Sequence, residues 1–552
     1  MSSVFNKYVQ NSKEYLRSDF LASIVVFLVA LPLCIGISVA VGVSPALGLI
    51  TGIIGGLAVG AIAGSPLQVS GPAASLFVIV ADIVLTRKDE YIANLGEGVA
   101  LTDAIENDAE GHALAALGLT CCLAGIIQFV AGRYRLGRWF RAVSPAVIKG
   151  MLSGIGALIL ISQFHVMLDH TAMWGDKAAR GGLQYLATIP TAIMKCFEFG
   201  DGSTHFQAAL IGIVTISTIF LWSKYAPKKV SFIPGALVGI IAATLFFKLL
   251  GLKVIPLDVP KNMFGDTTFP SVEWGAFILD QSTWLSAFVI AIVASAATLL
   301  TASAVDNMSR DIGVKTDFDQ ELTSQGVGNF LCGLVGALPM TGVIVRSSAN
   351  VQAGARTRNS TIFHGAWLLL FVFFLPQLLN YIPKSALGAL LVYTGMKLLN
   401  PKQFFELRKV GESEGWIYLI TVGLIVSVDL LVGVAVGVAL SAGKLLYRFT
   451  HLDVELISDE EKHKYELKLK GAATFVRLPI LADYLEDLPG DAELHVCLEE
   501  VEYIDHACFE LLMNWADAHV EDGGSLVMDW ARLHGAFQSD ANKDDQSTGQ
   551  TA

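Results

Sequence analysis

Two short stretches interrupted by glycine and proline decide the fold. The first reads Gln68-Val-Ser-Gly-Pro-Ala-Ala-Ser75, and the second reads Leu338-Pro-Met-Thr-Gly-Val-Ile-Val-Arg-Ser347. A membrane helix that begins at such a stretch begins at mid-membrane, where unwound backbone is tolerated only beside a cavity. We therefore expect two half-helices that direct their N-termini at one central point.

The composition around these stretches indicates a membrane protein. Of the 552 residues, 53% are hydrophobic and only 16% are charged. Apolar runs of about 20 residues, the length that crosses a bilayer, recur along most of the chain. We expect fourteen spans, at 20–42, 46–64, 70–86, 113–131, 144–168, 206–223, 232–251, 284–305, 323–338, 341–355, 361–381, 385–398, 416–429 and 431–449.

Basic residues predict the orientation of the spans. Short loops rich in lysine and arginine stay in the cytoplasm, and such loops include Arg133, Lys224 and Arg356. Residues 1–19 are polar and lack the apolar core of a signal peptide, so we expect a cytosolic N-terminal segment. Because the number of spans is even, the sequence predicts a multi-pass protein of the cell (inner or plasma) membrane with both termini in the cytoplasm.

The chain changes character after the last span. We expect a transmembrane domain over 20–452, a soluble domain over 453–538 and a disordered polar tail over 539–552. Alternating strands and helices predict an α/β layer in the soluble part. The expected strands contain Tyr465, Leu467 and Leu469, Leu494–Leu498, and Ser525–Met528, and the expected helix is Cys508–Val520.

The two half-helices predict a binding site for an anion. Their first backbone N–H groups have no partner within the helix and carry a partial positive charge. Arg346 lies one turn into the second half-helix, and a guanidinium deep in an apolar span usually faces a cavity or a partner. The alternatives are that glycine and proline only kink these spans, and that Arg346 lies near the cytoplasmic end or pairs with Asp306 or Asp429. The expected cradle comprises Ser70, Gly71, Ala73, Ala74, Ser75, Thr341, Gly342, Val343 and Ile344.

Other classes of site are missing from the sequence. There is no cluster of metal ligands, no glycine-rich phosphate loop with lysine and no nucleophile elbow. The seven cysteines are scattered without metal-ligand spacing. The sequence thus predicts no enzyme, no metal, no cofactor and no nucleic-acid partner; the expected partners are a small inorganic anion and the lipid bilayer.

Several motifs, in order along the chain, carry a resemblance to the SulP family of anion transporters. They are Val29-Ala-Leu-Pro-Leu33, Val69-Ser-Gly-Pro-Ala-Ala74, Asp306-Asn-Met308, Gln325-Gly-Val-Gly-Asn329 and Arg346-Ser-Ser-Ala-Asn-Val-Gln-Ala-Gly-Ala-Arg-Thr357. The resemblance implies an α-helical polytopic fold with a seven-plus-seven inverted repeat, and a substrate site between the third and tenth half-helices. It also implies a core domain that moves against a gate domain. A C-terminal cytosolic STAS domain and a homodimer formed through that domain and the gate region are further implications.

Three departures from the family pattern affect the expected mechanism. The switch of a STAS domain would be a phosphorylatable serine after an aspartate. The matching stretch, Tyr503-Ile-Asp-His-Ala-Cys508, has no hydroxyl at that position. This favours a structural or dimerising role for the domain. Many bacterial relatives carry an acid in the eighth span, where this chain reads Ala297-Thr-Leu-Leu-Thr301. Ile344 is likewise apolar where a hydroxyl could bind sodium. Uniport or anion exchange is therefore favoured over coupling to protons or sodium.

The substrate is expected to be a small monovalent anion moved by an elevator-like mechanism. Leu33 and Ile37 would make the pocket wall apolar, together with Ala297 and Thr301. The stretch Asp19–Cys34 resembles a SulP branch often found beside carbonic anhydrases, which favours bicarbonate and a functional link to such an enzyme. Sulfate and dicarboxylates are the alternative substrates, and an anion-binding sensor or motor without net transport is the alternative class. A nucleobase carrier is disfavoured because both half-helix motifs lack glutamate.

Overall fold

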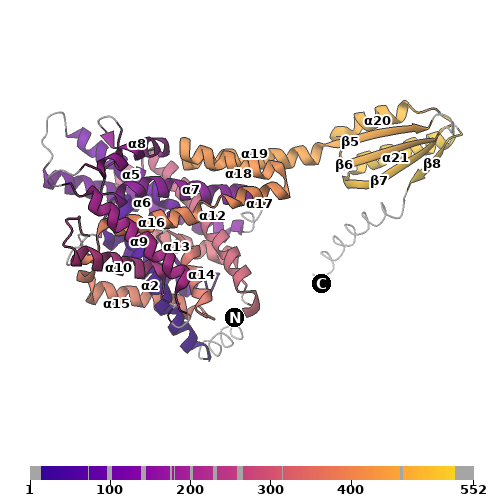
Figure 1. Ribbon diagram of the computed structural model, residues 1–552. Coiled ribbons are helices and arrows are strands. Elements are labelled where there is room, and N and C mark those ends of the chain that lie inside the picture. Colours follow the sequence, from indigo (N-terminus) through magenta and orange to yellow (C-terminus); the bar gives the residue numbers. More distant parts are fainter. Residues whose placement is uncertain are drawn as a thin grey trace. The chain divides into compact units, whose positions relative to one another are not determined.

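The structure, a computed structural model, describes residues 14–528 except 73, 96–101, 138–143, 175–176, 179–180, 199–202, 228–229, 231–232, 258–264, 266, 314, 460–463 and 522. The expected tail at 539–552 therefore lies outside the described residues. The chain forms two compact units, Met1–Val438 and Ala439–Ala552. Each unit is described by itself below (Figure 1).

The first seven predicted spans are all present as membrane segments in the first unit. The third of them is broken into a strand, a 3-10 turn and a helix. The elements are α2 (Leu16–Val41), α3 (Pro45–Ile54) continued by η1 (Gly55–Val59) and α4 (Gly60–Ile62), β1 (Ser70–Pro72) with η2 (Ala74–Leu76) and α5 (Phe77–Asn94), α6 (Asp103–Arg133), α7 (Pro145–Met167), α9 (His205–Tyr225) and α10 (Gly235–Leu249).

The other seven spans follow the same plan. The third is again broken, here into a strand and a helix. The elements are α12 (Gln281–Met308), α13 (Phe318–Leu334), β4 (Met340–Gly342) with α14 (Ile344–Gln352), α15 (Asn359–Phe374), α16 (Lys384–Leu398), α18 (Glu412–Ser427) and α19 (Leu430–Thr450). The connections contain β2 (Met173–Trp174), β3 (Lys177–Ala178), α8 (Gly182–Lys195), α11 (Trp274–Phe277), η4 (Arg310–Ile312), η5 (Pro376–Tyr381) and α17 (Lys402–Val410).

The broken segments show how the two sets of seven are related. β1 and β4 pair antiparallel, so the helices that follow them leave the pair in opposite directions. That arrangement is what an inverted repeat requires. Among the described residues, seven helices are long and apolar enough to cross a membrane unaided. The predicted fourteen segments and their order are confirmed, and the amphipathic connection α8 is an addition that the apolar runs did not indicate.

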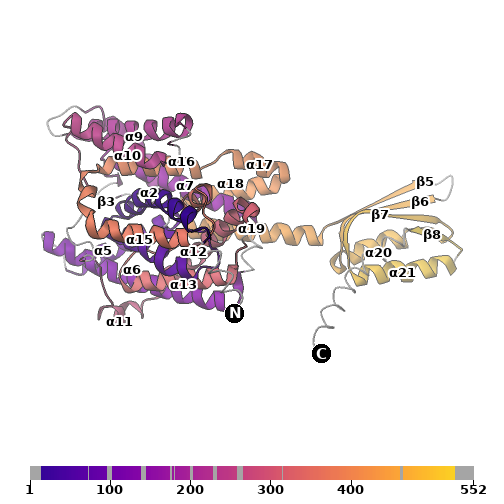
Figure 2. The same ribbon diagram turned by 90° about the horizontal axis from the view of Figure 1, so that it is seen from below.

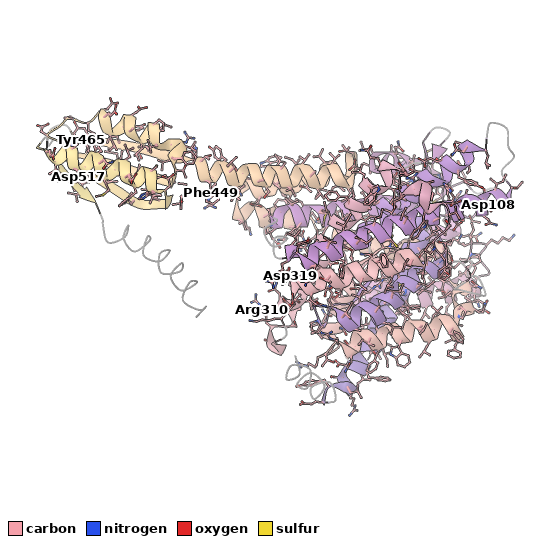
Figure 3. The ribbon with its side chains drawn as sticks, turned by 180° about the vertical axis from the view of Figure 1, so that it is seen from behind. Asp108, Arg310, Asp319, Phe449, Tyr465 and Asp517 are labelled. Atoms are coloured by element: carbon pink, nitrogen blue, oxygen red, sulfur yellow. The ribbon has the colours of Figure 1, made fainter. Side chains whose placement is uncertain are left out.

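Glycine lets two long helices of the first unit pack at close range. α6 and α13 run antiparallel, and Figure 3 shows Asp108, near the start of α6, far from Asp319, near the start of α13. An added Cβ on Gly125 would lie 2.5 Å from the backbone nitrogen of Phe330. One on Gly333 would lie 2.4 Å from the carbonyl oxygen of Gly118. Small residues at such contacts allow the backbones of membrane helices to approach closely.

The second unit is an α/β layer. Its four-stranded sheet has the order β5-β6-β7-β8, with β5 antiparallel to β6 and the other pairs parallel. Figure 2 shows both helices on one face of the sheet, where buried leucines such as Leu467, Leu481 and Leu512 form the core. The elements are β5 (Leu452–Asp459), β6 (Lys464–Ala473), η7 (Phe475–Arg477), α20 (Leu478–Glu486), β7 (Glu493–Ile504), α21 (His506–Glu521) and β8 (Ser525–Met528).

Every strand and helix that the sequence predicts in this unit is confirmed, whereas β5 and α20 were not predicted. The stretch at Tyr503–Cys508, which lacks the switch hydroxyl, runs from the end of β7 into the start of α21. There the Asp505 carboxylate accepts a hydrogen bond from the Cys508 backbone N–H at 2.8 Å. Asp505 therefore stabilises the helix N-terminus, as a capping residue does.

The packing of α6 against α13 yields a first prediction. Gly125→Ala should lower the melting temperature of the purified protein in detergent, because its Cβ would press on the backbone of α13. Overpacking of this kind costs about 1–3 kcal/mol. Gly111→Ala, in the same helix, is the matched control, since an added Cβ there meets no atom within 4 Å. Equal melting temperatures for the two variants would show that this close approach does not stabilise the fold.

Candidate anion site

The two broken segments meet directly at the centre of the first unit. Ser70 pairs with Gly342, Gly71 with Thr341, and Pro72 with Met340. The Val343 backbone N–H extends the pair by donating to the carbonyl of Val69 at 2.9 Å. Both half-helices, α5 and α14, therefore begin beside the same three-residue ladder, as the sequence analysis expected.

Side chains from α12 and α13 hold the strand β4 in place. Asn329 binds both polar backbone groups of Met340, accepting from its N–H at 2.7 Å and donating to its carbonyl at 3.1 Å. Thr298 accepts from the N–H of Gly342 at 3.0 Å, and Thr301 donates to the carbonyl of Gly342 at 3.1 Å. The polar backbone groups of Met340 and Gly342 thus have partners inside the protein, as burial in a membrane protein demands.

These contacts change which backbone groups are open to a ligand. The N–H groups of Gly342 and Val343 are both used inside the protein. In the described part of the chain, no partner is seen for the backbone N–H groups of Ile344, Val345 and Arg346, which form the first turn of α14. Open donors at a helix start attract anions, so the cradle from this half-helix begins at Ile344.

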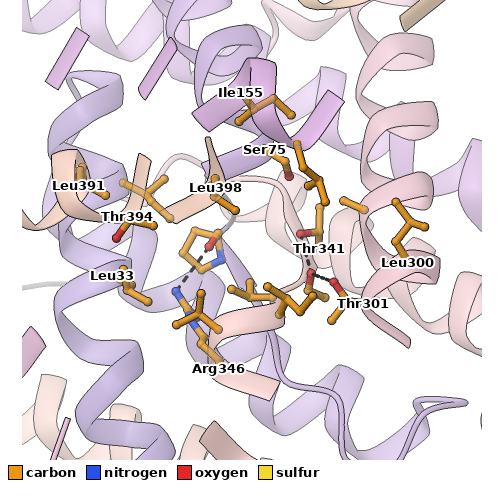
Figure 4. A pocket seen from close by; sticks show the side chains of 18 residues that line it. Leu33, Ser75, Ile155, Leu300, Thr301, Thr341, Arg346, Leu391, Thr394 and Leu398 are labelled. Carbon is orange, nitrogen blue, oxygen red and sulfur yellow. Dashed lines mark hydrogen bonds between the residues drawn. The ribbon is translucent and has the colours of Figure 1, made fainter. Parts of the chain in front are cut away.

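Arg346 places a cation at the start of α14. Its side chain is fully buried, and one Nη2 hydrogen bond, to the carbonyl of Pro72 at 3.4 Å, crosses to the other broken segment (Figure 4). Nε and Nη1 have no hydrogen-bond partner among the described residues. Gly71 makes room for the guanidinium, because a Cβ there would lie 2.1 Å from Nη1.

No carboxylate in the described part of the chain neutralises Arg346. Asp306, one alternative partner, instead accepts hydrogen bonds from Thr316. Asp429, the other, accepts from the backbone N–H of Val432. A buried cation without a partner is costly, and a bound anion would remove that cost.

A cavity of about 100 Å³ lies against Arg346 and the two half-helices. Ten of the fourteen residues predicted for the site line this cavity (Figure 4). They contribute a cation, hydroxyl groups and apolar wall. They are Leu33, Ile37, Ser75, Ala297, Thr301, Thr341, Gly342, Val343, Ile344 and Arg346.

Of the other four predicted residues, Ser70 and Gly71 are not among the described residues that line it. Ser70 lies in β1 behind the cavity, where its hydroxyl accepts a hydrogen bond from the Gln325 amide at 2.5 Å. Gly71 faces the guanidinium of Arg346 instead. Ala74 lies in the turn η2, and Ala73 lies outside the described residues.

The opposite wall of the cavity was missed by the sequence analysis. It consists of apolar residues and one threonine from α7 and α16. Continuous apolar runs give no signal for which face of such a helix lines a cavity. The added residues from these helices are Leu152, Ile155, Leu391, Thr394 and Leu398.

Two buried carboxylates were also missed, and neither lines the cavity. Glu321 is fully buried and accepts from the backbone N–H of Ser65 at 2.9 Å and from the amides of Gln68 at 2.8 Å and Gln325 at 3.1 Å. Asp19 is also fully buried and accepts from backbone and side-chain donors of the loop after α14, including the N–H of Arg356 at 2.7 Å. Their acceptor positions are thus taken up inside the fold.

Comparison with known proteins identifies the chain's relatives. It is 24% identical over 534 residues to YvdB of Bacillus subtilis, provisionally named a sulfate transporter, covering 93% of this chain and 91% of YvdB. It is 25% identical to the bicarbonate transporter BicA of Picosynechococcus over 81% of this chain and 73% of BicA. Neither relative is named as an enzyme.

Solved structures and family models agree with these matches. The fold is similar to that of the murine anion transporter Slc26a9, with a TM-score of 0.69 at 16% identity, over 94% of this chain and 86% of that one. Residues 16–421 match the model of the Sulfate permease family. This match covers both broken helices and every residue named in the lining of the cavity. This chain is a member of the Sulfate permease family and hence an anion transporter of the membrane.

Proposed function

We propose that the protein carries a small inorganic anion, with bicarbonate favoured, between the N-termini of half-helices α5 and α14. The observation that carries this proposal is the buried guanidinium of Arg346, which faces the cavity and has no anionic partner among the residues that the structure describes. The open N–H groups of Ile344 and Val345 and the hydroxyl of Ser75 would add donors around the same point, whereas the Thr341 hydroxyl donates to the carbonyl of Gly342 at 3.2 Å.

The size and charge of the cavity favour a small monovalent anion. About 100 Å³ accommodates a few water-sized groups, and Leu33 and Ile37 leave part of the wall apolar. One guanidinium balances one negative charge. Sulfate or a dicarboxylate would bring a second charge into this wall, and BicA, named a bicarbonate transporter, is among the relatives.

The walls of the cavity suggest how the anion moves. One wall comes from α2, α12 and the broken segments, and the other comes from α7 and α16. An elevator-like mechanism would slide the first group, which holds the anion, against the second. In this scheme the α7 and α16 residues are the fixed surface past which the site travels.

The same cavity argues against coupling to a cation. Ala297 supplies no carboxylate, and the Thr301 hydroxyl already donates to Gly342. Glu321, the carboxylate buried in α13, is held by amide donors away from the cavity. We therefore favour uniport or anion exchange over sodium or proton symport.

We further propose that the second unit is a STAS domain in the cytoplasm of a cell-membrane protein with both termini inside. Its sheet with two helices on one face fits such a domain, and Asp505 there caps α21. Because the switch position carries no hydroxyl, we favour dimerisation over regulation by phosphorylation as the role of this domain. The gate helices would contribute to the same dimer. A functional link to a carbonic anhydrase would follow from bicarbonate as substrate.

Removing the cation tests the site. Arg346→Ala should reduce uptake of labelled bicarbonate into proteoliposomes about 10- to 100-fold, the effect of losing a charged hydrogen bond worth about 1.5–3 kcal/mol. Arg346→Lys should lose less, because the charge remains. Elution volume and melting temperature establish that each variant is folded and keeps the size of the native assembly. Unchanged uptake by a folded Arg346→Ala would exclude Arg346 from the site.

Displacing the guanidinium without removing it gives an independent check. Gly71→Ala would put a Cβ 2.1 Å from Nη1 of Arg346, so uptake should fall although every charge is kept. Gly36→Ala is the control, because its Cβ meets only the side chain of Leu391 at an ordinary 3.5 Å. If both variants transport like the native protein, the position of the guanidinium does not matter for transport.

Ion dependence tests the substrate and the coupling. Uptake of labelled bicarbonate should be independent of sodium and of a proton gradient, and excess sulfate should compete poorly. Protein-free liposomes control for permeation of carbon dioxide. Strong competition by sulfate would make sulfate the substrate, and cation dependence would refute the inference from Ala297. Saturable binding without flux would instead support a sensor or motor.

A further inference from the structure

Three histidines lie close together where α7 ends, outside the anion site. The ring centroids of His165 and His170 are 5.5 Å apart, and those of His170 and His205, the first residue of α9, are 6.0 Å apart. The amphipathic helix α8 reaches the same cluster, because the hydroxyl of its Thr188 lies 3.0 Å from Nε2 of His165. No group of three histidine, cysteine or carboxylate side chains in the described part of the chain could hold a metal ion, so a metal site does not account for the cluster.

Hydrogen bonds distinguish His170 from its two neighbours. His165 uses both ring nitrogens, since Nδ1 donates to a backbone carbonyl of α7 at 3.0 Å and Nε2 meets the Thr188 hydroxyl. His205 donates from Nδ1 to the carbonyl of Leu168 at 3.1 Å. Nδ1 of His170 is buried and has no hydrogen-bond partner among the described residues. A buried polar group without a partner is costly, so movement toward water is favoured more for His170 than for the other two rings.

Titratable groups face His170 from three helices. Lys195 belongs to the last turn of α8, His165 to α7 and His205 to α9. The carboxylate of the adjacent Asp169 accepts a hydrogen bond from the hydroxyl of the residue before α9. Burial lowers the pKa of His170 to about 4, and the positive charge of Lys195 contributes to this shift. The ring is therefore neutral at neutral pH, and acid would place a second cation beside Lys195.

The end of α8 that carries Lys195 packs against the helices that line the anion cavity. Ala192 and Cys196, on either side of Lys195 in the sequence, are buried in one apolar cluster with Met167 of α7 and Ala389 of α16. The same two helices, α7 and α16, form the wall of the cavity opposite the broken segments. This contact therefore links the histidine cluster to the wall of the anion cavity.

We propose that His170 and Lys195 form an acid-sensitive latch, in which protonation of His170 releases the last turn of α8 from α7 and α16 and slows transport. Two cations at this contact repel each other, and the charged imidazole is better solvated once α8 has moved away. Transport slows because the wall formed by α7 and α16 loses part of its packing. With both termini in the cytoplasm, as proposed above, α7 ends outside the cell, so the latch responds to external acid. The effect on transport rests on the proposed function, whereas the release of α8 does not.

The pH range of the release follows from the pKa of His170 in the two states. In the packed state the pKa is about 4, and in the released state it returns to about 6.5, the ordinary value. The packed state is therefore fully favoured above about pH 6.5 and becomes less stable as the pH falls from there toward 4. Between pH 7.5 and 5.5 the released fraction should rise about three- to ten-fold. The lower value allows for the partial exposure of the ring.

The reactivity of Cys196 measures the release without any flux. This cysteine is buried and follows Lys195 directly. In the purified protein, its reaction with dithiodipyridine, a thiol reagent that also works in acid, should be about three- to ten-fold faster at pH 5.5 than at pH 7.5, relative to free cysteine. Cys196→Ser identifies its share of the signal. An unchanged relative rate would overturn the proposal.

Substitution of His170 shows whether this ring is the sensor. His170→Gln keeps a polar side chain that cannot become charged, so Cys196 should react at the same relative rate at both pH values. His506→Gln is the matched control, because it removes a histidine of the second unit whose side chain is 78% exposed, and it should keep the native response. Lys195→Gln removes the repulsion and should reduce the rise. A full rise in His170→Gln that melts like the native protein at pH 7.5 would refute the latch.

Efflux from loaded vesicles tests the effect on transport. Vesicles with the His170 side outward, filled with labelled bicarbonate at pH 7.5, should lose it about three-fold or more slowly into a buffer of pH 5.5 than into one of pH 7.5. His170→Gln should remove this difference. Equal rates for the native protein would refute the effect on transport. Efflux no faster than from protein-free liposomes would instead refute bicarbonate as the substrate, and the reactivity of Cys196 would still decide whether α8 is released.

Discussion

The antiparallel pairing of Ser70–Pro72 with Met340–Gly342 is the contact on which the architecture of the first unit depends. Each broken helix leaves backbone N–H and C=O groups without helical partners at a depth where water is excluded, and each such group costs several kcal/mol if it stays unpaired. Neither segment can satisfy these groups alone. The pair satisfies part of them, and Asn329, Thr298 and Thr301 satisfy most of the others. The polar residues of α12 and α13 are thus explained by the need to close this ladder.

Two buried charges lie beside the ladder, and they differ in how many of their hydrogen-bonding groups have partners. This difference indicates which charge stabilises the fold and which is available to a ligand. Glu321 receives hydrogen bonds from a backbone N–H and two glutamine amides. One of those glutamines, Gln325, continues to Ser70 in the ladder, so the carboxylate helps to fix the broken segment. Among the described residues, Arg346 has one long bond, to Pro72, and two of its nitrogens have no partner. A satisfied buried charge stabilises the fold, whereas an unsatisfied one is available to a ligand.

The sequence was sufficient for those features that depend on local chemistry. Apolar runs, glycine and proline gave the fourteen segments and the two breaks, and the place of Arg346 in an apolar span gave its buried charge, because each of these follows from what a bilayer permits. Features that depend on a partner far along the chain were not predictable. The N–H groups of Gly342 and Val343 looked open, but their acceptors are Thr298 in α12 and the carbonyl of Val69, just before β1. Leu152 and Leu391 are indistinguishable from lipid-facing leucines, and Glu321 reads as an ordinary acid near the start of a helix.

The balance of charge along the path limits what the site can hold. In an apolar wall the attraction between Arg346 and an anion is strong, but so is the cost of stripping the anion of water. A monovalent anion is neutralised by the one guanidinium, and the remaining N–H and hydroxyl donors need to replace only part of its hydration. A divalent anion would leave one charge uncompensated beside Leu33 and Ile37, because the described residues that line the cavity include no second cation. Under the proposed function, the same scarcity of charge that would disfavour sulfate would also let a monovalent anion leave again, and a carrier must release its substrate.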